Sequence, residues 1–122
     1  MQNKNSNKYD LEDRTAKFSQ EILKFCKILS KDIVSSPVIS QLVRSATSVG
    51  ANYCEANNAE SRSDFKHKIG ISKKEAKETV YWLKMVLTLF PERKDEINLL
   101  RKEATELTLI FGAIIKTTIN NS

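Results

Sequence analysis

The spacing of apolar residues limits the possible folds of this chain more than any other feature. Mostly apolar residues recur at alternating intervals of four and three from Leu11 to Ile33, and the same stepping returns from Ile97 to Ile114. This is the rhythm of a helix that lies along the seam of a bundle. The 122 residues include only three glycines and two prolines, so the chain has few places to turn. Long helices are therefore expected, and a sheet is not.

Capping and breaking residues divide the chain into four expected helices. Asp10 can cap the first helix, and Ser36 with Pro37 can begin the second. Ser63 can cap the third helix, which Pro91 ends. We predict helices over about residues 10–34, 37–59, 64–90 and 95–119, within a single domain over 1–122 whose first residues, 1–8, form a frayed tail. Short connections between such helices predict an all-α, up-down-up-down four-helix bundle.

The second predicted helix has two faces that are each expected to be covered by another surface. One face is apolar, with Leu42, Ala46 and Val49, and fits the core of the chain itself. The other face is small and polar but carries little charge, and consists of Ser45, Ser48, Asn52 and Glu55. We interpret this second face as part of an interface with another copy of the chain.

The third predicted helix separates into a core stripe and two unlike flanks. One flank combines two carboxylates with the only tryptophan of the chain, in the set Ile71, Glu75, Glu78 and Trp82. Aromatic side chains are enriched where proteins meet, so this flank is predicted to join the interface. Alternatively, Trp82 merely widens the bundle core. The interface hypothesis predicts that the bundle assembles into a homo-oligomer.

Positive charge is concentrated on the same third helix. Between Arg62 and Lys84, seven basic residues face three acidic ones, so this segment carries +4 of the net charge of +5. The predicted nucleic-acid-binding residues are Lys66, Lys73, Lys77 and Lys84 on this helix, with a second row of Lys17, Lys24, Lys27 and Lys31 on the first helix. Such concentration on a rigid element is typical of a protein that binds phosphate backbones. The alternative is a lysine surface that only maintains solubility.

The sequence holds no convincing catalytic set. Arg62 and His67 match the Arg-x4-His spacing of HEPN-type ribonucleases, in which histidine acts as acid or base and arginine stabilises the transition state. The alternative is a capping arginine and a surface histidine. Glycine-rich phosphate loops, Ser/His/Asp sets and Cys/His clusters are missing, and one histidine cannot build a di-metal carboxylate site. We therefore expect a protein that is not an enzyme and needs no metal or cofactor.

The cysteines and the ends of the chain indicate its compartment. Cys26 and Cys54 lie far apart, without neighbours that would form a redox pair, so both are expected to be reduced thiols. The longest nearly apolar run, 107–115, is too short to cross a bilayer, and the polar start has no signal core. A cytoplasmic protein without membrane contact is expected.

Three long stretches resemble one known family. They read Gln41-Leu42-x-Arg44-Ser45-Ala46-x-Ser48-Val49-Gly50-Ala51-Asn52-Tyr53-x-Glu55-Ala56, then Ser61-Arg62-x-Asp64-Phe65-x-His67-Lys68, then Lys74-Glu75-Ala76-x-Glu78-Thr79-x-Tyr81-Trp82-Leu83. The earlier Asp13-Arg14-Thr15-x-x-Phe18 and the later Glu106-Leu107 fit as well. Together these residues resemble the bacterial four-helix-bundle family of 23S ribosomal RNA intervening-sequence proteins.

The resemblance implies properties that the residues alone do not show. It implies a small bundle that assembles into a ring-like homo-oligomer, a homopentamer, without established enzymatic activity. Some bacteria encode such proteins within insertions of ribosomal RNA genes. Related proteins are accessory factors of diversity-generating retroelements, which implies RNA or an RNA–DNA hybrid and a reverse transcriptase as partners. We accordingly predict an oligomeric protein that binds structured RNA through its lysine faces and reads backbone and shape, because no aromatic stacking platform is evident. The alternatives are a protein-interaction scaffold and a HEPN-like ribonuclease.

Overall fold

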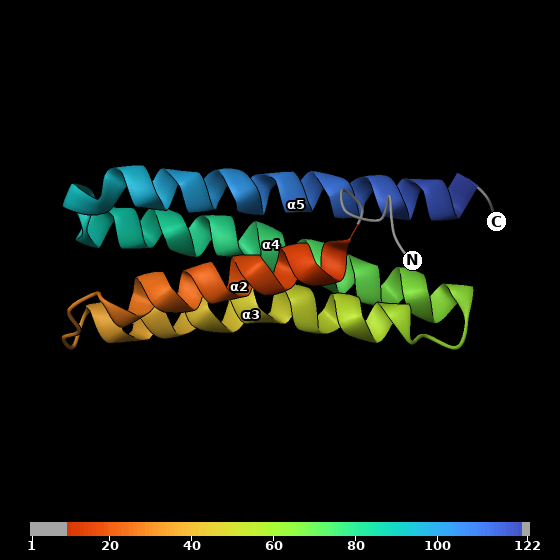
Figure 1. Ribbon diagram of the computed structural model, residues 1–122, viewed down its shortest axis with the longest axis horizontal. Helices are drawn as coiled ribbons and strands as arrows, with labels where there is room; N and C mark the ends of the chain where they lie inside the picture. Colours follow the sequence, from red (N-terminus) through yellow and green to blue (C-terminus); the bar gives the residue numbers. More distant parts are fainter. Residues whose placement is uncertain (1–9, 121–122) are drawn as a thin grey trace.

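A computed structural model of the chain describes residues 10–120, which form a bundle of four long α-helices (Figure 1). The helices are α2 (Leu11–Lys27), α3 (Ser35–Asn57), α4 (Arg62–Leu89) and α5 (Lys94–Asn120), with a short 3-10 helix, η1 (Pro91–Arg93), before the last. Each helix runs opposite to the one before it (Figure 1). The predicted all-α, up-down-up-down bundle is thereby confirmed. The predicted frayed tail, 1–8, lies outside the described residues.

The helices do not pack equally against one another. The contacts between α3 and α4 are the most extensive, followed by those between α4 and α5 and between α2 and α3, whereas α2 and α5 touch at few points. The core stripes predicted from the sequence lie inside, and Ile22, Leu42, Leu83 and Phe111 are fully buried. The bundle is therefore closed on three sides and has an open seam between α2 and α5. Within residues 10–120, none of the helices is both long enough and apolar enough to cross a bilayer.

The first helix ends seven residues earlier than predicted, at Lys27 instead of residue 34. At this end, the Lys31 Nζ donates hydrogen bonds to the carbonyl oxygens of Cys26 (3.3 Å) and Leu29 (3.2 Å), so these groups are satisfied without a further helical turn. Leu29 still folds into the core, but Ile33 is 91% exposed. The prediction that Ile33 continues the apolar stripe is therefore wrong.

The starts of α3 and α4 differ from those predicted. The Oδ1 atom of Asp32 accepts hydrogen bonds from the backbone N–H groups of Ser35 (2.8 Å) and Val34 (2.9 Å), and these bonds lower the pKa of Asp32. α3 therefore begins at Ser35, two residues before the predicted start. Ser61, not Ser63, caps α4, because its Oγ accepts a hydrogen bond from the Asp64 N–H at 3.0 Å.

Small residues allow α3 to approach its neighbours closely. Gly50 faces Thr15 of α2, and an added Cβ at Gly50 would lie only 2.9 Å from the Thr15 Oγ1. Toward α4, the Thr79 hydroxyl donates a hydrogen bond to the Ser45 Oγ at 2.9 Å, and the Ser72 hydroxyl donates to the Val49 carbonyl, also at 2.9 Å. Ser45, Ser72 and Thr79 are fully buried. Ser45 was predicted to lie at an interface between subunits, but it is buried between α3 and α4 of one subunit.

Candidate nucleic-acid interface

The lysines predicted on α4 form one exposed row. Lys66, Lys73, Lys77 and Lys84 are all exposed, and the row spans about 27 Å at a rise of about 1.5 Å per helical residue. None of the four forms an ion pair with another of residues 10–120, whereas their neighbour Lys68 binds Glu55 at 2.7 Å. The charge of the row is therefore available to a ligand.

The lysine row lies beside α5, and two of its four members line a groove between the helices. Lys73 passes over Gly112, where an added Cβ would lie 3.7 Å from both the Cε and the Nζ of the lysine. The groove is lined by Lys77, Val80, Tyr81, Lys84, Thr105, Thr108 and Leu109, and none of these residues is acidic. We call it the α4–α5 groove.

The structure adds two residues to this surface that the sequence prediction missed. Tyr81 is 52% exposed and lines the groove between Lys77 and Lys84. It supplies an aromatic side chain on the basic surface, which the sequence prediction did not identify. Lys116 is exposed one helical turn beyond Gly112, on the same face of α5. Their place depends on how α4 and α5 are aligned, which the pattern of a single helix does not give.

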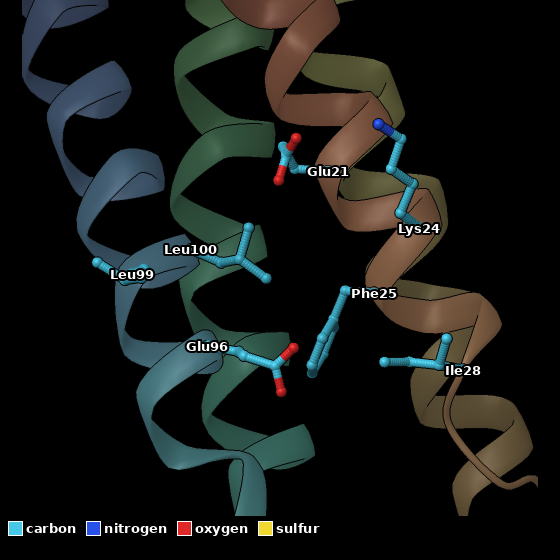
Figure 2. A pocket seen from close by; sticks show the side chains of 7 residues that line it. All are labelled: Glu21, Lys24, Phe25, Ile28, Glu96, Leu99 and Leu100. Carbon is cyan, nitrogen blue, oxygen red and sulfur yellow. The ribbon is translucent and has the colours of Figure 1, made fainter.

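The second lysine row, on α2 and in the connection after it, has a different electrostatic setting. Lys17, Lys24, Lys27 and Lys31 are exposed as predicted. However, the open seam beside them contains carboxylates: Glu21 lies near Lys24, and Glu96 lines the same groove beside Phe25 (Figure 2). Glu103 lines a second groove together with Lys17. The Lys31 amine is also occupied at the end of α2. This row is therefore a weaker phosphate-binding candidate than the row on α4.

The open seam itself is a partly apolar groove. Phe25 of α2 and Leu100 of α5 point into the space between the helices, while Ile28 and Leu99 lie at its margins (Figure 2). Leu99 is 71% exposed and Ile28 is 55% exposed.

Farther along the seam, one arginine joins the two helices. The Nε of Arg14 lies 2.7 Å from the Oε2 of Glu103, and its Nη2 lies 3.0 Å from the Oε1 of Glu106. The bonds to Glu103 and Glu106 raise the pKa of Arg14 above its ordinary value. Arg14 and Glu106, which belong to the early and late parts of the family pattern, are thus direct partners in space.

Three of the predicted interface residues, Glu75, Glu78 and Trp82, belong to a polar network that joins α3 to α4. Glu75 is largely buried, and Arg44 approaches it at 3.2 Å while also binding Glu78. The Trp82 indole N–H donates a hydrogen bond to Glu78 at 2.8 Å, and this bond, together with Arg44, lowers the pKa of Glu78. The half-buried Trp82 also packs against the core. Arg44 therefore links α3 to α4 within one subunit.

The remaining polar interface candidates make hydrogen bonds or ion pairs inside the chain. The Asn52 side chain donates to the Ser48 carbonyl at 2.9 Å, and the Ser48 hydroxyl donates to the Arg44 carbonyl at 2.7 Å. Glu55 pairs with Lys68, and Ile71 is half-buried. These groups need no second subunit to satisfy them, so the interface remains a prediction.

Arg62 and His67 both belong to the first turns of α4 and are exposed. Arg62 lies near Phe65 and the end of α5, beside Thr117 and Thr118. Five residues correspond to about 140° of net rotation around a helix, so the two side chains leave α4 on different sides. That placement does not favour joint action on one phosphate, although the ribonuclease hypothesis remains untested.

The fold and this surface define a class: a small four-helix bundle with a basic groove along its two C-terminal helices. Comparison with known families then identifies it. Residues 7–113 match the model of the 23S rRNA-intervening sequence protein family, and the chain belongs to that family. The resemblance found in the sequence is thereby confirmed.

A solved structure agrees with this assignment. It is the crystal structure of a protein of unknown function from the S23 ribosomal protein family of Bacteroides thetaiotaomicron VPI-5482. The two proteins are 33% identical over 86% of this chain and 97% of the other, with a TM-score of 0.79. Comparison with curated proteins gives no match.

Proposed function

We propose that this protein binds structured RNA through the lysine row on α4 and catalyses no reaction. The observation that carries the proposal is the row itself: four exposed lysines on one rigid helix, without ion pairs to other residues of 10–120, beside a groove whose lining contains no carboxylate. The family name refers to an intervening sequence of 23S rRNA, which supports RNA as the nucleic acid.

The physical basis is the release of counterions from the RNA backbone. Each phosphate that a lysine neutralises frees condensed cations and steepens the salt dependence of binding. Four such contacts would give a slope of about −3 to −4 in a plot of log affinity against log salt concentration. Affinity should then fall on the order of 100-fold between about 50 and 200 mM salt.

The test compares two variants that lose the same charge. One replaces Lys73, Lys77 and Lys84 with Gln, and the control replaces Lys17, Lys24 and Lys27 with Gln. Binding of a labelled RNA hairpin is measured by fluorescence anisotropy at several salt concentrations. The α4 variant should bind more weakly and lose about 2 to 3 units of slope, while the α2 control should change much less. Charge reversal of all four α4 lysines with no effect on RNA binding would refute the proposal.

A second candidate function is a protein-interaction scaffold, for example an accessory subunit of a reverse transcriptase. The observation that favours it is the α2–α5 seam, in which Phe25 and Leu100 line an open groove bordered by the exposed Leu99 (Figure 2). A partner held there should survive nuclease treatment in a pull-down, and Leu99→Lys should release it. A partner released by nuclease would instead be held through RNA.

We also propose a ring-like homo-oligomer, a pentamer, formed through the outer face of α3 and α4. The half-buried Trp82 and Ile71 beside the Arg44 network support this surface. Trp82→Ala should lower the mass in solution measured by light scattering. An unchanged oligomer mass would restrict Trp82 to a role in the core of the subunit.

A further inference from the structure

Among residues 10–120, Tyr81 is the only aromatic residue that lines the α4–α5 groove. It lies four residues after Lys77 and three before Lys84, so both ammonium groups are neighbours on the same helical surface. The ring is 52% exposed. Its position is supported by Trp82, which it meets edge to face with ring centroids 4.9 Å apart and planes inclined by 77°.

The groove around this ring has the composition of a nucleotide site. Its volume is about 440 Å³, and Val80 and Leu109 give it apolar walls. Leu109 is 68% exposed, which is a large apolar exposure in a groove that Lys77 and Lys84 also line. Thr105 and Thr108 add hydroxyl groups from α5. Lysines alone would suit any polyanion, but an exposed aromatic and apolar wall suits a flat base.

We propose that the α4–α5 groove binds an unpaired nucleotide, with its base stacked on Tyr81 and its flanking phosphates on Lys77 and Lys84. This inference rests on the proposed RNA-binding function and adds the kind of RNA: a single-stranded segment or loop. The bases of a duplex are stacked on one another and cannot reach a tyrosine at the surface of a helix, whereas unpaired bases can be splayed out onto aromatic side chains. The lysine row alone would not distinguish the two forms.

The test compares single-stranded and duplex RNA of the same length, about 10 nucleotides, which is within the usual range of single-strand sites. Tyr81→Leu removes the aromatic face but keeps an apolar side chain, and Tyr81→Phe keeps the aromatic face as the matched control. Tyr81→Leu should weaken single-strand binding about tenfold or more while changing duplex binding less than about twofold. Tyr81→Phe should behave as the wild type.

The fluorescence of Trp82 provides an independent signal. Because Trp82 is the only tryptophan and touches Tyr81, a base stacked on the tyrosine should change its emission in a titration with single-stranded RNA but not with duplex. Circular dichroism verifies that the variants remain folded, which the exposure of Tyr81 favours.

The outcomes separate this inference from the proposed function. Equal single-strand affinity of the wild type and Tyr81→Leu would overturn the inference while leaving RNA binding by the lysines intact. Wild-type protein that binds neither RNA would overturn both. An acidic peptide that binds the groove more tightly than single-stranded RNA, with the same dependence on Tyr81, would overturn the inference in favour of a protein ligand.

Discussion

One methyl group at Gly50 should weaken the contact between α2 and α3. A Cβ at this buried position would lie 2.9 Å from the Oγ1 and 3.1 Å from the Cβ of Thr15. Thr15 cannot easily move, because it is fully buried and its hydroxyl donates a hydrogen bond to the Leu11 carbonyl at 2.6 Å. The helices must therefore shift apart to accept Gly50→Ala.

Two opposing terms set the size of the effect. Overpacking of a well-packed core costs about 1–3 kcal/mol, whereas replacing a helical glycine with alanine gains about 1 kcal/mol from helix propensity. Gly50→Ala should thus destabilise the protein by about 0–2 kcal/mol. Gly70→Ala is the matched control, because its added Cβ meets no atom within 4 Å. The free energy of unfolding of Gly70→Ala should rise by about 0.5–1 kcal/mol.

The assay is urea and thermal unfolding followed by circular dichroism. The two alanine variants should differ by about 1–3 kcal/mol, equivalent to roughly 4 °C in Tm for each kcal/mol. Thr15→Ala removes the hydroxyl and should reduce the cost of Gly50→Ala in the double variant. If Gly50→Ala proved as stable as Gly70→Ala, the close approach of α2 and α3 would be refuted.

Three further predictions follow from the ionisable groups. Arg44→Met leaves the largely buried Glu75 without its ion pair and should cost about 1–3 kcal/mol in urea unfolding; a change below about 0.5 kcal/mol would contradict the role of Arg44. The pKa of Glu78 in the folded protein lies below its ordinary value of 4.5. The ionised Glu78 carboxylate therefore contributes its full stabilisation of the fold above pH 4.5, and this contribution is lost as the pH falls through the folded pKa. Tm should therefore fall more steeply on acidification in the wild type than in Glu78→Gln, and equal slopes would contradict this. Burial raises the pKa of the Cys26 thiol to about 11, so alkylation should label exposed Cys54 first, and Cys26 only on unfolding.

The bundle could be predicted from the sequence because the spacing of apolar residues shows which face of each helix is buried. That spacing is the same whichever neighbour covers the face. The prediction failed at the end of α2, where Leu29 and Ile33 continued the pattern although Lys31 and Asp32 close one helix and open the next. Local hydrogen bonds there outweigh periodicity.

The candidate site was predicted only in part for a related reason. The lysine row could be read from α4 alone, but the role of Tyr81 depends on the register between α4 and α5, which brings Thr105, Thr108 and Leu109 beside it. Ser45 shows the same limit: the pattern indicated a face that avoids water, but it could not indicate that α4 of the same chain covers that face.

The most direct test of the central claim is protection of individual lysines from acetylation by bound RNA, measured by mass spectrometry. The α4 lysines that lie beside α5, Lys73, Lys77 and Lys84, should react more slowly when RNA is bound, and added salt should abolish the difference. Lys17, Lys24 and Lys27 should keep their rates. Protection confined to the α2 lysines, or no protection at all, would contradict the account.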